Sequence, residues 1–334
     1  MRICVIGAGS VGGLLAAKLA RAGEDVSVVA RGAHLEAIKR DGLRLVEEDG
    51  GEFAVKLAAS DKIADFRAMD CVVLAMKAHQ VAAVAAEVPA MLGPAGVILT
   101  AQNGIPWWYF FKHGGAHEGR RIDSVDPGGF IADHLPIGRV LGSVVYAAAE
   151  IAAPGVIRHI ESLRFTLGEI DDAATPRVTE LSHILHRAGF KAPVATDIRA
   201  EIWLKLWGNL TFNPVSALTH ATLVDICQDP PVRALVARMM TEAQVIGEAL
   251  GVRFRLPIDR RIAGAEAIGK HKTSMLQDIE AGREIEIDAL LGSVLELGRV
   301  AGLPAPTLET VYALAKLTDR MVQEQRGRLR VEPF

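Results

Sequence analysis

The stretch "RICVIGAGSVGGLLAAKLARAGEDVSVVAR", residues 2–31, decides the fold. Its first five residues form a short, β-branched apolar run that is typical of a buried parallel strand. A GxGxxG turn follows, then apolar residues at helical spacing, and then a second strand-like run, "DVSVVA". Placed between a strand and a helix, this turn predicts a dinucleotide-binding site.

Each glycine of the motif has a distinct physical task. Gly7 allows a tight turn, Gly9 lets a pyrophosphate approach the backbone, and Gly12 lets the helix pack close to the strand. The N–H groups and the positive dipole at the start of the helix then face the phosphates. A glycine-rich turn without a ligand is the structural alternative. The predicted cofactor-binding turn consists of Gly7, Ala8, Gly9, Ser10, Val11 and Gly12.

The end of the second strand indicates which cofactor binds. An enzyme that uses NAD usually has a carboxylate there, which accepts hydrogen bonds from the ribose. This chain has Ala30 and then Arg31, whose guanidinium fits a 2′-phosphate. The pattern therefore favours NADPH/NADP+, although a solvated surface arginine would look the same in sequence.

Two later strand ends also release polar side chains. Lys77 follows the run "DCVVLAM", and Asn103 follows "GVILTAQ". Ligands of open α/β sheets bind outside the carboxyl ends of the strands, so both residues are expected near cofactor or substrate. Between these strands we expect a helix over residues 80–91. The runs "LRLVEE" and "EFAVKLA" predict a hairpin.

Composition excludes several classes of function. The 334 residues have a formal net charge of −3 and no long block of like charge, so neither a nucleic-acid nor a membrane surface is expected. The three cysteines, Cys4, Cys71 and Cys227, lie in or beside apolar segments and predict buried reduced thiols. The sequence has no Cys/His cluster, so no metal site is expected. Without a signal peptide or membrane span, a cytoplasmic protein is expected.

After residue 196 the apolar periodicity is mostly helical, with Gly and Pro between the segments. The predicted fold is therefore an N-terminal Rossmann-type α/β dinucleotide-binding domain, residues 1–195, followed by an all-α C-terminal domain, residues 196–334. The apolar helices could cover one another or a second subunit, which leaves a homodimer open.

The first of these helices, "EIWLKLWGNLTFNP", carries one ordered polar stripe. Glu201, Lys205, Asn209 and Asn213 recur at steps of four residues and so share a helix face. A lysine in apolar surroundings has a lowered pKa, which suits a proton donor near neutral pH. The alternative is the wet face of an amphipathic helix.

A second polar set lies in "TSMLQDIEAGREIEID". Glu286 begins a helix whose same face is otherwise apolar, so it either favours the helix dipole or meets a substrate hydroxyl. Ser274 precedes a short helix, where it could cap that helix or meet a carboxylate. Residues 106–139 have no clear period and could form a lid. Their Trp107, Trp108, Arg120 and Arg121 are candidates for lining a cleft.

Together these motifs resemble the ketopantoate reductase (2-dehydropantoate 2-reductase) family. The resemblance rests on the glycine turn, Arg31, "MKAHQV", "QNG", "WLKLWGNLTFNPVSALT" and "TSMLQDIEAGREIEID". It implies that Lys205 is the general acid and that Glu286 binds the hydroxyl of the substrate. It also implies that Asn209, Asn213 and Ser274 bind substrate, that Lys77 and Asn103 lie between cofactor and substrate, and that Arg31 contacts the 2′-phosphate.

The resemblance further implies an NADP-dependent oxidoreductase that reduces a small 2-oxo acid, 2-dehydropantoate, to pantoate in pantothenate biosynthesis. The chain departs from the family pattern in residues 106–139, where "NGIPWWYFF" replaces the usual glycine and glutamate. A reductase of a different 2-oxo acid or carbonyl compound therefore stays open. A non-catalytic NADP(H)-binding sensor is the alternative outside enzymes, but it would not need Lys205 and Glu286 on apolar faces.

Overall fold

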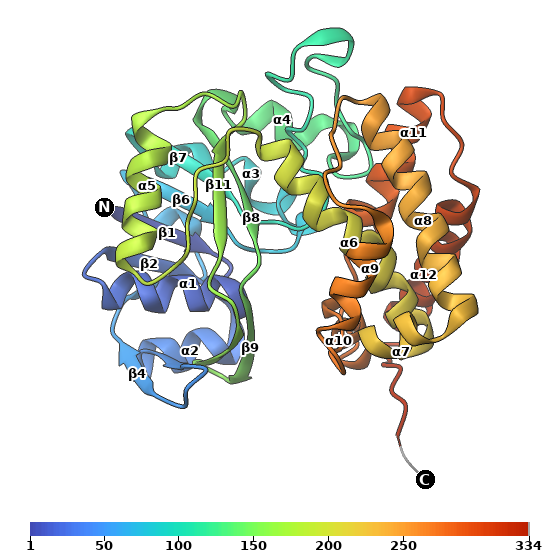
Figure 1. The fold of residues 1–334 in the computed structure, drawn as a ribbon. Coiled ribbons are helices and arrows are strands. Elements are labelled where there is room, and N and C mark those ends of the chain that lie inside the picture. Colours follow the sequence, from blue (N-terminus) through green and yellow to red (C-terminus); the bar gives the residue numbers. More distant parts are fainter. Residues whose placement is uncertain (333–334) are drawn as a thin grey trace. The chain divides into compact units, whose positions relative to one another are not determined.

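The computed structural model describes residues 1–332, which form two compact units (Figure 1). The first unit consists of Met1–Gln102, Pro106–Arg121 and Asp126–Ile198, and the second of Asn103–Ile105, Ile122–Val125 and the chain from Arg199 onward. The first is an α/β unit and the second is helical, which confirms the predicted fold class.

The α/β unit is built on a seven-stranded sheet in the order β11-β8-β7-β6-β1-β2-β5. All neighbouring strands are parallel except β11, which runs antiparallel to β8. The chain adds β2 on one side of β1 and later β6 on the other, so the end of β1 is the point where the strand order reverses. The strands are β1 (Arg2–Ile6), β2 (Asp25–Val29), β5 (Ala58–Ser60), β6 (Met69–Leu74), β7 (Leu92–Thr100), β8 (Val140–Val145) and β11 (Phe165–Glu169).

A second sheet of four strands, in the order β4-β3-β10-β9, covers the other side of helix α1 (Ser10–Arg21). The expected hairpin is confirmed, because β3 and β4 pair antiparallel. Helix α1 approaches β10 so closely that a Cβ on Gly13 would lie 2.7 Å from the Ile157 side chain. The strands of this sheet are β3 (Leu43–Val46), β4 (Glu52–Val55), β9 (Ala148–Ala153) and β10 (Val156–Glu161).

The prediction of a helix over residues 80–91 is wrong. The segment contains only the short α3 (Ala82–Ala85), with 3₁₀ turns over Ala78–Gln80 and Val88–Met91. Pro89 lies in the last turn, where it has no N–H to continue a helix. The other helices of this unit are α2 (Gly32–Asp41), α4 (Phe130–His134) and α5 (Pro176–Arg187).

The aromatic residues after β7 belong to the core of the α/β unit. Trp107 and Trp108 are 4% and 1% exposed. The Trp108 indole N–H donates to the Thr100 hydroxyl at 3.0 Å, and its ring packs over Gly142, where a Cβ would lie 2.9 Å from it. The tryptophans are therefore packing residues, which removes them as candidates for lining a cleft. Arg121 forms an exposed ion pair with Asp133.

The three cysteines are free and buried, as expected. Burial raises the pKa of the Cys4 thiol to about 11 and that of Cys71 to about 12. Both thiols are therefore protonated at neutral pH and are poor nucleophiles.

The helical unit is centred on contacts among five helices and on one π-helical turn. Helix α8 packs against α7, α9, α11 and α12. The π-helix η7 (Asp288–Gly292) runs directly into α11 and also contacts α12. The helices are α6 (Ile198–Thr219), α7 (Leu223–Gln228), α8 (Pro230–Ala249), α9 (Ile258–Glu266), α10 (Ser274–Glu280), α11 (Ser293–Ala301) and α12 (Pro306–Glu324).

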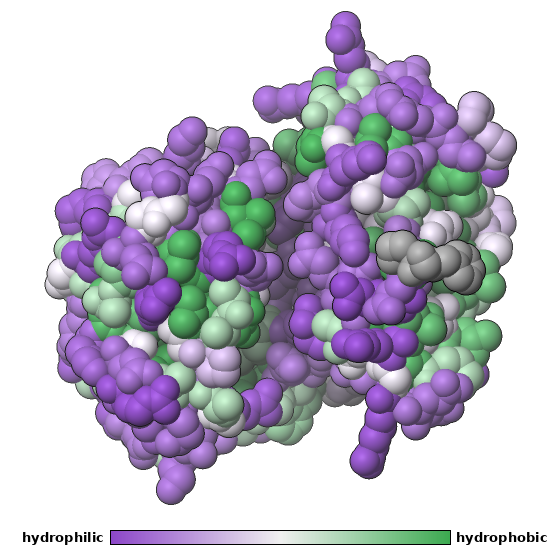
Figure 2. Space-filling model, turned by 90° about the horizontal axis from the view of Figure 1, so that it is seen from below, coloured by the Kyte–Doolittle hydropathy of each residue, from purple (hydrophilic) through white to green (hydrophobic). Residues whose placement is uncertain are grey.

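On the face shown in Figure 2, each unit presents a mainly hydrophilic surface with apolar side chains in separate groups. Such a mixture is ordinary for a folded chain. Among the helices of residues 1–332, none combines the length and the hydropathy that crossing a membrane requires.

We predict that the two neighbouring tryptophans respond differently to replacement by phenylalanine. Trp108→Phe removes the donor to the Thr100 hydroxyl and should lower the free energy of unfolding by about 1–3 kcal/mol. Trp107→Phe is the matched control, because the buried Trp107 N–H has no hydrogen-bond partner within residues 1–332. Chemical denaturation followed by circular dichroism measures both. Equal losses would show that the hydrogen bond contributes nothing.

Candidate functional site

The glycine turn after β1 has the shape that the sequence predicts. Gly7 has φ +97°, which favours glycine. A Cβ on Gly12 would lie 2.0 Å from the Gly7 carbonyl oxygen, so only glycine fits there. A Cβ on Gly9 would meet nothing within 4 Å, so the backbone at Gly9 borders open space. The turn therefore leaves room for a group to approach the start of α1.

The N-terminus of α1 is suited to an anion. In the part of the chain that the structure describes, no side chain caps this helix, and its first turn holds no acidic residue. Its first N–H groups and the helix dipole thus face the open space beside Gly9. This arrangement fits a pyrophosphate group.

His34 braces the glycine turn, and sequence reasoning assigned it no role. Its Nδ1 accepts from the Gly155 N–H at 2.9 Å, which leaves Nε2 as the donor to the Ala8 carbonyl at 2.8 Å. Burial lowers the pKa of His34, so this neutral tautomer is the stable one. The brace fixes the first turn of α2 against Ala8. No local sequence pattern marks such a contact.

The remaining predicted cofactor residues follow their strands as expected. Arg31 is exposed at the start of α2, two residues after β2 ends. Lys77 is half-buried after β6, where its N–H donates to the Gln80 side chain at 3.3 Å. Gln102 secures this region, because its amide donates to the Leu74 carbonyl at 2.6 Å. Their contacts with a cofactor stay predictions.

In the helical unit, α6 buries both of its tryptophans, and its Lys205 side chain extends toward Asn103. Trp203 and Trp207 are fully buried, and the Trp207 N–H donates to the Met240 carbonyl at 2.8 Å. Both indole rings pack against Phe254, with ring centroids 6.0 and 4.7 Å away. These anchors fix the rotation of α6 about its axis, and with it the direction of the polar stripe.

Lys205, Asn103 and Glu286 meet in one hydrogen-bonded chain. The Lys205 ammonium donates to the Asn103 Oδ1 at 2.6 Å, and the Asn103 Nδ2 donates to the Glu286 Oε2 at 3.2 Å. An ammonium only donates and a carboxylate only accepts, so the amide has one possible orientation. Three residues that sequence reasoning selected separately thus form a single cluster.

This cluster holds its lysine near the midpoint of titration at mildly alkaline pH. Burial lowers the pKa of the Lys205 ammonium to about 8, while the Glu286 carboxylate acts in the opposite direction. Lys205 can therefore exchange a proton within the physiological range, as a general acid requires.

Gly104 lets Asn103 reach this cluster. It has φ +87°, and a Cβ there would lie 2.1 Å from the Ala289 carbonyl oxygen. Next to it, the Ile105 N–H donates to that same oxygen at 3.0 Å. The Ser293 hydroxyl also donates to it, at 2.7 Å. The π-helix η7 and the 103–105 segment are thus joined backbone to backbone.

The other predicted substrate residues are placed less fully. Asn209 is half-buried one turn beyond Lys205, and Asn213 is 7% exposed one turn farther. Ser274 does not cap α10, because it is the first residue of that helix, and the Thr273 hydroxyl accepts from the Leu276 N–H instead. The Ser274 side chain is exposed. Its role toward a carboxylate stays a prediction.

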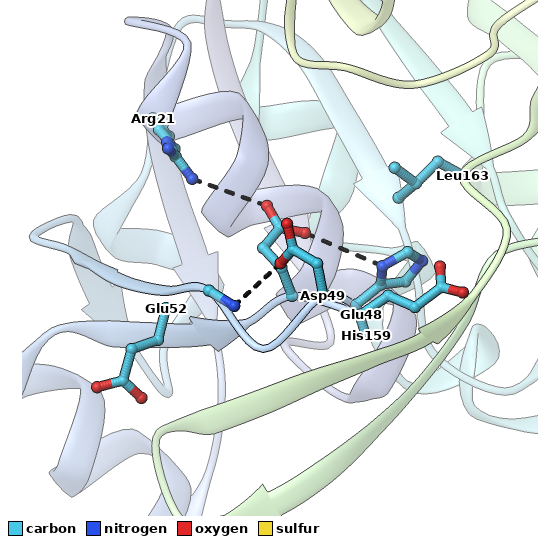
Figure 3. Close-up of a pocket in the computed structure, with 8 residues that line it drawn as sticks. Arg21, Glu48, Asp49, Glu52, His159 and Leu163 are labelled. Atoms are coloured by element: carbon cyan, nitrogen blue, oxygen red, sulfur yellow. Dashed lines mark hydrogen bonds and ion pairs between the residues drawn. The ribbon is translucent and has the colours of Figure 1, made fainter.

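A surface pocket of about 750 Å³ in the α/β unit lies elsewhere, beside the β3–β4 hairpin (Figure 3). Two of its four acidic lining residues form ion pairs within the protein. Glu47 binds Lys18 at 2.8 Å, and Glu52 binds Arg44 at 3.0 Å. Within residues 1–332, no group of three His, Cys, Asp or Glu side chains is arranged to hold a metal ion. We therefore do not take this pocket as the functional site.

Known proteins resemble the chain over nearly its whole length. The family model described as Ketopantoate reductase PanE/ApbA matches residues 3–112, and its C-terminal counterpart matches residues 197–319. A 2-dehydropantoate 2-reductase of Mesorhizobium japonicum is 54% identical over 95% of this chain and 97% of its own length.

Two solved structures share the fold at lower identity. A PanE/ApbA family ketopantoate reductase from Ralstonia eutropha has a TM-score of 0.83 at 27% identity, covering 97% of this chain and 100% of its own. A 2-dehydropantoate 2-reductase from Geobacter metallireducens has a TM-score of 0.82 at 26% identity, covering 95% and 99%.

We predict that Gly104→Ala disrupts the cluster through a backbone clash. The new methyl group would overlap the Ala289 carbonyl oxygen and displace Asn103 from Lys205. The free energy of unfolding should fall by about 1–3 kcal/mol for the strained φ and by more for the clash. Gly114→Ala is the matched control, since its φ of +74° gives the same strain with nothing within 4 Å. Thermal denaturation compares them, and equal losses would rule out the clash.

Proposed function

The chain belongs to the ketopantoate reductase family, and from this premise we propose that it reduces 2-dehydropantoate to pantoate with NADPH, in pantothenate biosynthesis. It is an oxidoreductase acting on a C=O/CH–OH pair, in a family that depends on NAD(P). The observation that carries the proposal is the hydrogen-bonded chain of Lys205, Asn103 and Glu286.

The residues of the glycine turn fit a dinucleotide. Gly9 borders open space, α1 has no side-chain cap, and His34 keeps the turn in place. Arg31, exposed at the start of α2, would hold a 2′-phosphate, which is the basis for proposing NADPH over NADH. When bound, this cofactor supplies the hydride.

Lys205 completes the reduction by giving a proton to the carbonyl oxygen of the substrate. Its ammonium also stabilises the negative charge that develops on that oxygen, which favours the transition state over the ground state. Asn103 orients the ammonium because its Oδ1 accepts a hydrogen bond from it.

The carboxylate of Glu286 accepts from the substrate hydroxyl group. Because Asn103 is neutral, it bridges acid and lysine without forming an ion pair with either. Asn209 and Asn213 bind substrate from the following turns of α6, and Ser274 meets its carboxylate. An amide stripe on a helix with buried tryptophans supports this arrangement.

The proposed function is tested by following NADPH absorbance at 340 nm with 2-dehydropantoate. The expected result is that kcat/KM for this substrate exceeds that for a panel of other 2-oxo acids and bulkier carbonyl compounds. A higher value for another compound would assign a different substrate. Tight NADPH binding with no oxidation by any of them would identify a non-catalytic sensor.

We predict that kcat for reduction falls as pH rises through about 8. The protonated Lys205 is the active form, so activity is complete below its pKa of about 8 and lost above it. Lys205→Ala should lower kcat by at least about 10²-fold with NADPH affinity nearly unchanged. Lys205→Arg is the control: its guanidinium stays charged, so residual activity should not decline near pH 8. An unchanged kcat in Lys205→Ala would remove Lys205 from the mechanism.

We predict that Arg31→Ala weakens NADPH binding selectively. Losing a charge-assisted contact to phosphate should raise the Kd for NADPH by roughly tenfold or more, with little change for NADH. Arg44→Ala is a suitable control, because it removes another exposed arginine, one that pairs with Glu52. Fluorescence titration with both cofactors gives the ratio. Equal weakening of NADPH and NADH would contradict the 2′-phosphate contact.

A further inference from the structure

Glu286 lies between two residues, Ile285 and Asp288, that form hydrogen bonds with α12. It follows Ile285 and comes just before η7, so it has no preceding helical turn to fix its direction. The isoleucines on either side, Ile285 and Ile287, are 3% and 0% exposed. The chain on both sides of Glu286 is therefore buried, and α12 supplies the polar contacts that this buried chain needs.

The first contact is on the N-terminal side of Glu286. The carboxylate of Asp319 accepts from the Ile285 N–H at 3.2 Å, and the Gln323 amide donates to the same oxygen at 3.4 Å. Asp319 is only 6% exposed. Burial raises its pKa, with Glu284 adding to the effect, while the Ile285 N–H and Lys316 lower it. Burying a carboxylate costs free energy unless it is hydrogen-bonded, and here the Ile285 N–H is one of its donors.

The second contact is on the C-terminal side of Glu286. The carboxylate of Asp288 accepts from the Tyr312 hydroxyl at 2.7 Å and from the Lys316 ammonium at 2.5 Å. The Lys316 pair is about half exposed and contributes little by itself. The Tyr312 hydroxyl differs from Lys316, because burial and Asp288 together raise the pKa of this hydroxyl to about 12. It therefore stays a proton donor throughout the working pH range.

Tyr312, Lys316 and Asp319 recur along α12 at spacings of four and three residues, so they lie on one face of that helix. We propose that Asp319 and Tyr312 are positioning residues: Asp319 holds the Ile285 N–H and Tyr312 holds the Asp288 side chain, so that the Glu286 carboxylate between them stays at the Asn103 amide. This inference rests on the proposed function, in which Glu286 binds the substrate hydroxyl. Neither residue touches the reacting atoms. Their effect is through the direction of Glu286, and a misplacement of about 1 Å can lower activity by roughly 10²-fold.

The test compares Asp319→Ala, Asp319→Asn and Tyr312→Phe. Asp319→Ala leaves the buried Ile285 N–H without its acceptor, and KM for 2-dehydropantoate should rise about tenfold or more with a smaller fall in kcat. Asp319→Asn keeps an oxygen that can accept from Ile285 and should restore most of the loss. Tyr312→Phe should raise KM in the same direction, and it serves as the second test if Asp319→Ala does not fold.

The matched control is Glu242→Gln. Glu242 of α8 accepts from the N–H groups of Thr307 and Leu308 at 3.0 Å and so holds the start of α12 without contacting the Glu286 segment. This variant should lower stability and leave KM unchanged. If Asp319→Ala and Tyr312→Phe change KM no more than Glu242→Gln does, the two residues are structural only and the proposal fails.

A second readout does not depend on substrate. The Lys205 ammonium meets the Asn103 amide and the Glu286 carboxylate, and this carboxylate raises the pKa of Lys205. Glu201 precedes Lys205 by one turn on α6. If Glu286 moves away, the pKa of Lys205 falls further. Competitive acetylation over a pH series, quantified by mass spectrometry, should therefore show Lys205 titrating at lower pH in Asp319→Ala and Tyr312→Phe than in wild type.

The Lys205 titration tests the positioning role of Asp319 and Tyr312 separately from the proposed function. A wild-type protein that does not reduce 2-dehydropantoate would overturn the proposed function, while a lowered Lys205 titration in the variants would still support the positioning role. An unchanged titration would overturn that role.

Discussion

One amide, Asn103, joins the lysine and the glutamate of the candidate site in the helical unit. Its oxygen accepts a hydrogen bond from the Lys205 ammonium and its nitrogen donates one to the Glu286 carboxylate, so the amide has only one possible orientation. An aspartate at this position would form an ion pair and raise the pKa of the lysine. The neutral amide lets burial dominate instead, and the lysine keeps a pKa of about 8.

Much of the fold was predictable from the sequence because its signals are local. The glycine turn after Arg2–Ile6, the β3–β4 hairpin and the helical second half all follow from short-range periodicity and turn chemistry. Lys205, Asn103 and Glu286 were each selected as chemical residues. Only the family resemblance implied that they meet at one substrate, because these partners are 102 and 183 positions apart and no local pattern encodes such a contact.

The sequence misled where packing overrides composition. The aromatic run after Asn103 lacked a helical or strand period and suggested a lid, yet Trp108 is a core residue of the α/β unit. Two adjacent hydroxyl residues, Thr273 and Ser274, could each have capped α10, and only the backbone geometry selects Thr273. His34 had no recognisable pattern at all, because its two partners, Ala8 and Gly155, come from distant turns.

The π-helical turn at η7 sets the angular phase between Glu286 and α11. A π turn contains one more residue than an α-helical turn. In a helix of 3.6 residues per turn, one extra residue rotates the preceding side chains by about 100° about the helix axis. The apolar residues of α11 can therefore face their core while Glu286 faces Asn103. Removing one residue from this turn would leave the hydrophobic face of α11 as it is, but the Glu286 carboxylate would point in a different direction.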